Sequence, residues 1–253
     1  MTHLIAAATL AMASPSVVDV GPAASLLALA GQATAADIVQ RNFRDASMQA
    51  RIVQTDFREL REISSDFGNQ YRFRSIRIWV AEPMRLRLEA QVEDTNVTYI
   101  LNGFRQSARI PRLGINSRQD LSRSPGRLQT VFDFGILTPS LLENLFDAEF
   151  VRNDRATGNL VFDIRYKPEL NDSSRHRIWV DPERRIVTRR EWYGQGSRPR
   201  LRAIFLYQNP VQAGGIWLPT RVEVRSANNR VAGITEYIDY RVNQGIPEER
   251  FRL

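Results

Sequence analysis

The feature that most constrains the fold is a strict alternation of side chains over residues 84–92. Apolar side chains occupy the even positions, and charged or amide side chains occupy the odd ones. The apolar members are Met84, Leu86, Leu88, Ala90 and Val92. A period of two is typical of a β-strand with one face buried and the other in water, whereas a helix would repeat every 3.6 residues. This stretch is therefore predicted to be a strand with an apolar face and an arginine face.

Two further strands follow it and complete a meander over residues 70–110. Val97, Tyr99 and Leu101 share one face of the first. Asn102-Gly103 comes next, and because both residues tolerate a positive φ, the pair predicts a two-residue type I′ turn. Beyond the turn the alternation resumes, with one face made by Phe104, Gln106, Ala108 and Ile110.

The rest of the chain is predicted to be mainly β. Asp37 is placed to cap a short helix that runs to about Ala46, and a long strand follows over residues 48–63, with a bulge where its parity changes near Ile52. Later strands are predicted at 160–167, 175–180, 185–193, 201–207, 216–225 and 230–240, separated by turns rich in Gly, Asn and Asp. About eleven consecutive strands joined by short turns favour one highly curved antiparallel sheet.

Thr138-Pro139 predicts the start of a helix, with Thr as the N-cap and Pro at the first helical position. Apolar side chains then fall on one stripe, formed by Leu141, Leu142, Leu145 and Phe146. Such a stripe most often packs on a core. It also fits a lid over the open face of a curved sheet, and the two interpretations overlap.

Residues 105–127 carry six Arg and one acid, together with Gly114, Pro125 and Gly126. We interpret this stretch as a mobile basic loop. The simpler interpretation is a solvated loop, because runs of charge usually face water. The alternative is a docking element for an anionic surface, formed by Arg118, Arg123 and Arg127. The net charge of +7 also favours anionic partners, without choosing among lipid head groups, nucleic acid and acidic proteins.

Residues 1–35 have the pattern of a signal peptide, which leaves residues 36–253 as the mature domain. Residues 1–36 hold no Lys or Arg and one acid, Asp19, and two apolar runs each end in an Ala-x-Ala motif. Neither run reaches the roughly 18–20 residues that span a bilayer. We therefore expect export and cleavage near Ala35-Ala36, with no transmembrane anchor.

The residue types present argue against most enzymatic sites. The chain has no Cys, which excludes disulfides, thiolate metal sites and thiol nucleophiles. His176 is the one histidine beyond the leader, and its alternation with Ile178 and Val180 is more typical of a satisfied core histidine than of a catalytic base. No phosphate-binding Gly motif occurs, so no metal or cofactor is expected. A pair of carboxylates suited to glycoside hydrolysis stays possible.

A curved sheet of this size has a concave face that an apolar ligand can occupy. The candidates to line it are Leu86, Leu88, Tyr99, Leu101, Phe162, Ile164, Trp192 and Phe205. For each residue taken singly, ordinary core filling is the alternative.

Several motifs, in this order along the chain, resemble the LolA-like periplasmic lipoprotein carriers. They are a short first helix at 37–44, Trp-Val-Ala-Glu-Pro-Met-Arg-Leu-Arg at 79–87, Leu-Asn-Gly-Phe at 101–104, Trp-Val-Asp-Pro at 179–182, Gly-Ile-Trp-Leu-Pro at 215–219 and Ile-Pro-Glu-Glu-Arg-Phe at 246–251. The chain departs from the family at Glu82, where the carriers place an Arg that helps to hold the lid shut. The basic stretch is also longer than the family's usual connection.

The resemblance implies an incomplete β-barrel whose concave face, covered by short helices, takes up acyl chains without catalysis. It implies a periplasmic monomer whose partners are a lipid or lipidated protein, an inner-membrane delivery complex or an outer-membrane acceptor, and not nucleic acid. The alternative is a sensor or regulator of envelope stress with the same fold, and a secreted hydrolase ranks third. Fold transfers more safely than function in such a comparison.

Overall fold

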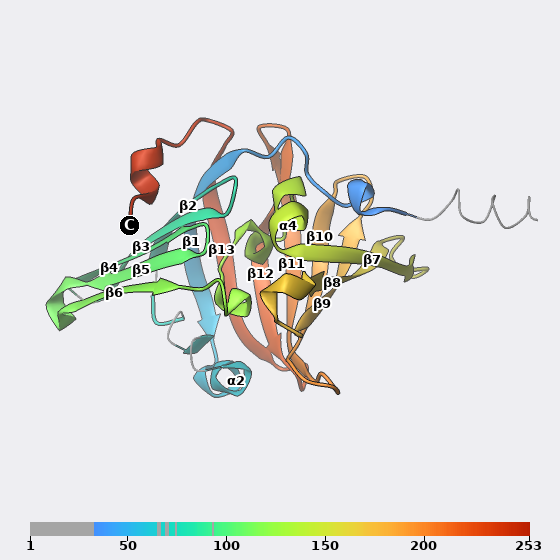
Figure 1. The fold of residues 1–253 in the computed structure, drawn as a ribbon, viewed down its shortest axis with the longest axis horizontal. Helices are drawn as coiled ribbons and strands as arrows, with labels where there is room; N and C mark the ends of the chain where they lie inside the picture. Colours follow the sequence, from blue (N-terminus) through green and yellow to red (C-terminus); the bar gives the residue numbers. More distant parts are fainter. Residues whose placement is uncertain (1–32, 65–66, 69–70, 74, 93) are drawn as a thin grey trace, which may run out of the picture. The chain divides into compact units, whose positions relative to one another are not determined.

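The computed structural model describes residues 33–64, 67–68, 71–73, 75–92 and 94–253. The predicted signal peptide lies outside these residues, apart from its last three positions. Thirteen strands, rather than about eleven, occur in the described part of the chain, and all belong to one antiparallel sheet (Figure 1). The strands are β1 (Asp45–Thr55), β2 (Ser75–Ala81), β3 (Arg85–Val92), β4 (Thr95–Asn102), β5 (Arg105–Ile110), β6 (Ile115–Asp120), β7 (Phe146–Asn153), β8 (Leu160–Tyr166), β9 (Arg175–Asp181), β10 (Ile186–Tyr193), β11 (Leu201–Ala213), β12 (Ile216–Ser226) and β13 (Val231–Val242).

The order of the strands explains how the concave face is closed. Strands β6 to β1 form one meander and β13 to β7 another, and the two join where β1 pairs with β13. The two edges of the sheet are therefore β6 and β7, which are neighbours in the sequence. Their connection, residues 121–145, has to cross from one edge to the other. We call these residues the covering segment, and in Figure 1 they lie in front of the central strands.

The covering segment contains η3 (Pro125–Arg127), η4 (Val131–Phe134) and α4 (Pro139–Asn144). Backbone hydrogen bonds fix it at four places: Leu121 N donates to Phe104 O (2.8 Å), Val187 N to Gly135 O (3.0 Å), Gln40 N to Leu137 O (2.8 Å) and Lys167 N to Leu145 O (2.9 Å). It also supplies much of the core, because many of its apolar side chains are buried. These are Leu121, Leu128, Val131, Phe132, Phe134, Ile136, Leu137, Leu141 and Leu145.

The predicted meander is confirmed, with one change at its turn. Leu88 lies opposite Ile78 on β2 and Tyr99 on β4, so apolar side chains align across three strands. The turn, however, has Gly103 and Phe104 at its centre, because Asn102 pairs with Arg105. Gly103 has φ +60°, whereas Phe104 is not among the residues with positive φ. This combination matches a type II′ turn, which needs a left-handed residue at its first central position alone.

Two predictions for the N-terminal region are wrong. The short helix is η1 (Ala35–Asp37), capped by Thr34 rather than by Asp37, and β1 already begins at Asp45. The first strand ends at Thr55 and α2 (Phe57–Ile63) follows, because the Asp56 side chain accepts hydrogen bonds from the N–H groups of the first helical turn. The predicted bulge is confirmed by a register shift between Ile52 and Gln54.

The predicted basic loop is also wrong, since residues 105–120 form the β5–β6 hairpin around η2 (Pro111–Leu113). Arg118 lies on the edge strand β6, and its Nη2 donates to Leu253 O at 3.2 Å. Arg123 follows β6 in a turn, and Arg127 ends η3. The strand signal was weak because β6 carries polar side chains on both faces, so no apolar alternation marks it.

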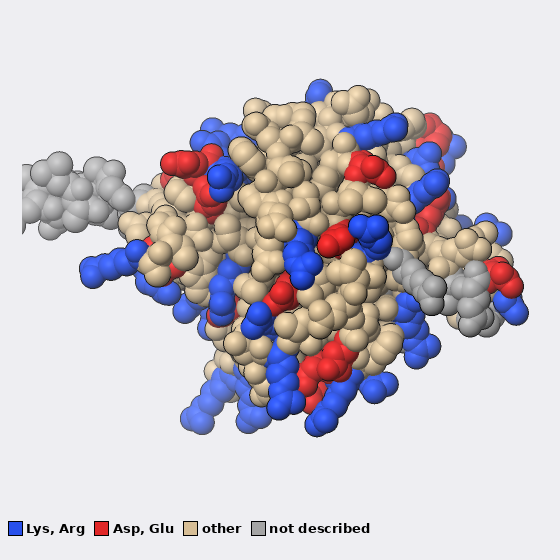
Figure 2. Space-filling model, turned by 180° about the vertical axis from the view of Figure 1, so that it is seen from behind, with Lys and Arg blue, Asp and Glu red and all other residues tan. Residues whose placement is uncertain are grey.

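The predicted arginine face of β3 exists, and the C-terminal residues cover it. η6 (Glu248–Phe251) lies beside β3 and β4, with Phe251 fully buried. The guanidinium of Arg85 lies 5.5 Å from the Phe251 ring centre, and Arg87 Nη1 donates to Arg250 O at 3.0 Å. Seen from behind, the molecule shows basic side chains with acidic ones among them, and basic side chains fringe its lower edge (Figure 2).

The remaining 3-10 helix of the described residues is η5 (Pro168–Leu170).

Candidate functional site

Two small cavities lie along the concave face of the sheet where the covering segment meets it. The first, which we call the Arg190 cavity, has a volume of about 80 Å³, and the second, the Leu88 cavity, has about 90 Å³. Leu128 and Thr130 line the first, and Gln129 between them lines the second. One short piece of the covering segment therefore separates the two spaces. Each has room for a few water molecules, and neither holds a whole acyl chain as the structure stands.

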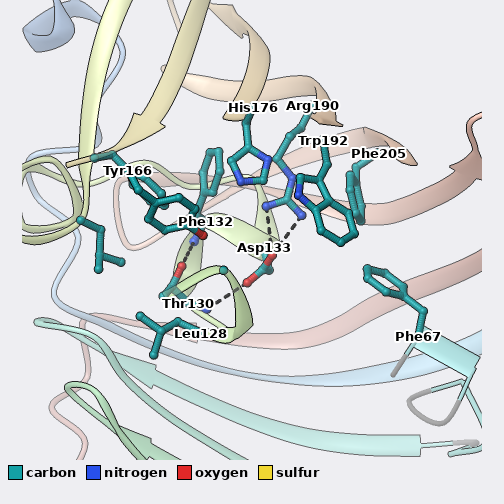
Figure 3. A pocket seen from close by; sticks show the side chains of 13 residues that line it. Phe67, Leu128, Thr130, Phe132, Asp133, Tyr166, His176, Arg190, Trp192 and Phe205 are labelled. Atoms are coloured by element: carbon teal, nitrogen blue, oxygen red, sulfur yellow. Dashed lines mark hydrogen bonds and ion pairs between the residues drawn. The ribbon is translucent and has the colours of Figure 1, made fainter. Parts of the chain in front are cut away.

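Aromatic side chains form most of the wall of the Arg190 cavity (Figure 3). Trp192 and Phe205 come from β10 and β11, and Phe67 stacks near both, with ring centres 6.4 and 6.0 Å away. On the other side Phe146 lies 5.4 Å from Phe132 and 4.9 Å from Tyr166. These rings suit an apolar ligand, whereas Arg190, Asp133 and Thr130 in the same lining can contact a polar group.

An ion pair between a buried arginine and a partly exposed aspartate lines this cavity. Arg190 is 4% exposed, and both its Nη atoms donate to Asp133 Oδ1 at 3.0 Å. The other carboxylate oxygen of Asp133 accepts from Thr130 N at 2.9 Å. The guanidinium also lies over the ring of Phe205, at 4.1 Å, and over that of Phe132, at 4.8 Å. Arg190 thus joins the sheet to η4 by charge and by cation–π contact.

His176 lies in the same wall and is not a satisfied core histidine. It is buried, as predicted, but Nδ1 has no hydrogen-bond partner among the described residues. Burial, and then the charge of Arg190, lower the pKa of His176 well below its usual value. The ring is therefore neutral at pH 7, and its edge-on contact with Phe132 (5.4 Å) is that of an aromatic side chain.

The Leu88 cavity is apolar. Its walls are Phe73, Ile76, Leu88, Ala90, Val97, Tyr99 and Gln129. Tyr99 turns its hydroxyl to Gln106 Oε1, at 2.9 Å, which leaves the ring to face the cavity. Burial, and then the nearby charge of Asp133, raise the pKa of Tyr99 to about 12. The two cavities are thus close enough for Asp133 to influence both.

The eight predicted ligand residues divide into two groups. Leu88 and Tyr99 line the Leu88 cavity, and Trp192 and Phe205 line the Arg190 cavity. The other four are at most 1% exposed and are packed into the core; they are Leu86, Leu101, Phe162 and Ile164. Register places the second group on the same face, since Leu86 lies opposite Leu101, and Ile164 opposite His176.

The predicted lid stripe is split between two elements. Thr138 caps α4 with Pro139 at its first position, as predicted. The helix ends at Asn144, however, and Phe146 is the first residue of β7, where it pairs with Tyr166. Leu141 and Leu145 are fully buried, Leu142 is half-buried, and Leu145 and Phe146 line the Arg190 cavity.

Glu82, the residue before Pro83, holds the start of α4. Its Oε1 accepts from the Thr138 hydroxyl at 2.9 Å, and its Oε2 accepts from the Ser140 hydroxyl. Burial raises the pKa of Glu82, although the hydroxyls of Ser140 and Thr138 and the charge of Arg85 oppose that shift. The residue before Pro83 therefore contacts the covering segment through a carboxylate.

Sequence reasoning missed the polar centre of the site. A signal for Arg190 existed, because it is two residues from Trp192 on one strand and so shares its inward face. Asp133 and Glu82 carried no such signal. The partner of Asp133 lies 57 residues away in the sequence, and the partners of Glu82 lie 56 and 58 residues away.

Comparison with solved structures identifies the fold. No family model and no curated protein matches the chain. A putative outer-membrane lipoprotein-sorting protein domain from Vibrio parahaemolyticus matches with a TM-score of 0.57 and 14% identity, covering 82% of this chain and 89% of that one. A LolA superfamily protein from Nitrosomonas europaea matches with a TM-score of 0.56 and 14% identity, covering 86% of this chain and 94% of that one. The chain has a LolA-like fold. A DUF1329 family protein from Desulfovibrio piger shares this LolA-like fold, with a TM-score of 0.56 and 13% identity over 83% and 90% of the two chains.

No cluster of three or more His, Asp or Glu side chains in the described residues of this LolA-like chain is arranged to hold a metal ion. In the same residues, no helix combines the length and the apolar character that a membrane crossing needs.

Proposed function

We propose that this chain is a periplasmic binder or carrier of acyl chains, belonging to a lipid or to a lipidated protein. The observation that supports it best is the position of the two cavities: both lie between the apolar concave face and one segment that crosses it. Lifting residues 128–130 would merge them into one trough lined by Leu88 and Tyr99 at one end and by Trp192 and Phe205 at the other.

The binding energy available to such a trough is large enough for uptake. Each buried CH₂ group contributes roughly 0.8 kcal/mol. Part of this energy is spent on displacing the covering segment, whose polar ties include the Glu82–Thr138–Ser140 contacts and the Arg190–Asp133 pair besides its backbone hydrogen bonds. A binder closed by a few polar contacts can exchange its own apolar segment for a ligand of the same character.

The proposal includes export by the N-terminal signal peptide and delivery partners at the inner and outer membranes. The fold match to a lipoprotein-sorting domain and a LolA superfamily protein supports it, as does the sequence pattern of residues 1–35. Mass spectrometry of organic extracts from the purified mature protein would identify a bound lipid directly. Repeated extracts free of lipid would count against the proposal.

Uptake of a fluorescent fatty-acid probe tests the concave face itself. Leu88→Glu places a charge in the Leu88 cavity, where desolvation is costly, and we expect it to reduce probe binding at least about tenfold. Glu89→Gln changes the neighbouring residue on the opposite face, where Glu89 pairs with Arg87, and should leave binding unchanged. Equal binding by both variants and the parent would show that this face is ordinary core.

A further inference from the structure

The ion pair of the Arg190 cavity is placed so that opening the site breaks it. Arg190 belongs to the sheet, on β10, and Asp133 belongs to η4 of the covering segment. Movement of that segment away from the sheet carries Asp133 with it. Arg190 would then be left on a face formed by Trp192, Phe205 and other aromatic rings. A buried charge that loses its partner is strongly destabilised, so this step opposes opening unless another anion replaces Asp133.

Arg190 has hydrogen-bonding capacity to receive such an anion. A guanidinium carries five N–H donors, and Asp133 takes one from each Nη. Its Nε is buried without a partner in the described structure, and so is the Nδ1 of His176 in the same wall. The planar fork of the guanidinium matches a carboxylate or a phosphate, which it can bind through two parallel hydrogen bonds.

Charge balance decides how the anion has to enter. With Asp133 in place the cavity holds one positive and one negative group, and His176 adds no charge. A second anion beside Asp133 would leave an excess negative charge next to that carboxylate, and the two like charges would repel each other. An anion that takes the place of Asp133 keeps the balance. The geometry therefore favours exchange over addition.

We propose that the site selects amphiphiles with an anionic head group, a carboxylate or a phosphate monoester, which replaces Asp133 as the partner of Arg190. This inference rests on the proposed function and specifies its ligand class. The head group binds Arg190, and the acyl chain occupies the trough that residues 128–130 vacate, toward Leu88. A neutral lipid can fill the same trough, but it leaves Arg190 without a counterion.

The test compares ligands that share one chain and differ in the head group. Binding of oleate, oleyl phosphate and oleyl alcohol to the mature protein is measured by calorimetry at pH 8, where both acids are ionised. We expect the two anionic ligands to bind at least about tenfold more tightly than the alcohol, because charge-assisted hydrogen bonds are worth about 1.5–3 kcal/mol. The ratio of oleate to oleyl phosphate then shows which head group fits better.

Variants test whether the Arg190–Asp133 pair causes the preference for anionic ligands over oleyl alcohol. Arg190→Met should bind oleate and oleyl alcohol equally, and Arg190→Lys, which keeps the charge, should retain part of the preference. Asp133→Asn should bind oleate more tightly than the parent, since it removes the competing carboxylate. The matched control is Asp163→Asn: Asp163 accepts from Arg177 Nε at 2.7 Å on the other face of the sheet, and its loss should leave the preference unchanged.

The outcomes separate the two proposals. A parent that binds oleate and oleyl alcohol with equal affinity overturns the selection of anions while acyl-chain binding stands. A parent that binds none of the three ligands overturns the proposed function itself. If Arg190→Met fails to fold, the comparison of Asp133→Asn with Asp163→Asn still decides, because equal oleate affinity in both variants contradicts the exchange.

Discussion

At the scale of single residues, the closed state depends on a carboxylate that holds two hydroxyls. Glu82 accepts from Thr138 and Ser140 at the start of α4, and it belongs to the connection between β2 and β3. This contact joins the first half of the sheet to the covering segment, as the Arg190–Asp133 pair joins the second half to it. Both contacts hold the covering segment against the sheet, together with its backbone hydrogen bonds.

Glu82→Ala should destabilise the closed state by about 1–3 kcal/mol, because it removes both acceptors and leaves two hydroxyls without their partner. Urea unfolding would measure this loss of stability. The same variant should release a bound fatty-acid probe faster than the parent, since one tie of the covering segment is gone. An unchanged release rate together with reduced stability would mean that Glu82 supports the fold and does not hold the segment closed.

The protonation of Glu82 makes stability depend on pH. Burial is the main cause that raises its folded pKa above the usual value of a glutamate side chain. The stability that comes from its neutral form is therefore fully present below the unfolded pKa and is lost as the pH rises through the folded pKa. Glu82→Gln cannot ionise, so its melting temperature relative to that of the parent should rise between pH 4 and pH 7. A difference that stays constant over this range would contradict the assignment.

At the scale of single elements, sequence alternation was a reliable guide where one face is apolar and the other polar. It predicted the apolar faces that carry Leu86, Leu88, Tyr99 and Leu101, and the structure supplies their pairing. It failed for β6, whose side chains are polar on both faces. The signal for α2 was local, in the Asp56 cap, and the apolar content of residues 57–63 fits a strand as well as a helix.

The lid stripe illustrates the same limit. Spacing suggested that Leu142 and Phe146 lie on one helix, yet Phe146 begins β7 because it pairs with β8, a contact that local sequence does not encode. Phe146 is 3% exposed and Leu142 is half-buried. The two positions should therefore respond differently to the same substitution.

Phe146→Asp should cost several kcal/mol of stability, because it buries a charge in the aromatic cluster with Phe132 and Tyr166. Leu142→Asp should cost about 1 kcal/mol, in line with its partial exposure, and should mainly speed the release of the fatty-acid probe. Urea unfolding and probe release would be measured for both, with the exposed Glu143→Gln as the control. If Leu142→Asp leaves the release rate at that of the control, α4 is a core helix and not a lid.

At the scale of the whole molecule, the covering of the concave face follows from strand order. Because β6 and β7 are consecutive in the sequence and lie at opposite edges, the chain between them has to cross the sheet. That order depends on the pairing of β1 with β13, which joins residues nearly two hundred positions apart. The motifs at 79–87 and 215–219 indicated the fold, but the partners of Arg190 and Glu82 required this long-range arrangement to be known.

The order of the strands also determines where the basic residues of the predicted docking element lie. Arg118, Arg123 and Arg127 are exposed and lie where edge strand β6 passes into the covering segment. A membrane or an acidic partner that approached this edge would therefore meet the segment that moves in the proposed uptake of a ligand. Exposed charges of this kind mainly steer the encounter, and salt screens them over about 8 Å at physiological ionic strength.

Replacing Arg118, Arg123 and Arg127 together by Gln should weaken association with vesicles rich in phosphatidylglycerol by about a hundredfold at low salt, since surface charges near an anionic membrane contribute about 1 kcal/mol each. Vesicle co-sedimentation at two salt concentrations would measure it, and the difference from the parent should shrink at the higher one. A control that replaces the exposed Arg155, Arg198 and Arg200 by Gln removes the same charge from the β7–β8 and β10–β11 turns. Equal losses in both triple variants would show that net charge, and not this edge of the sheet, governs the association.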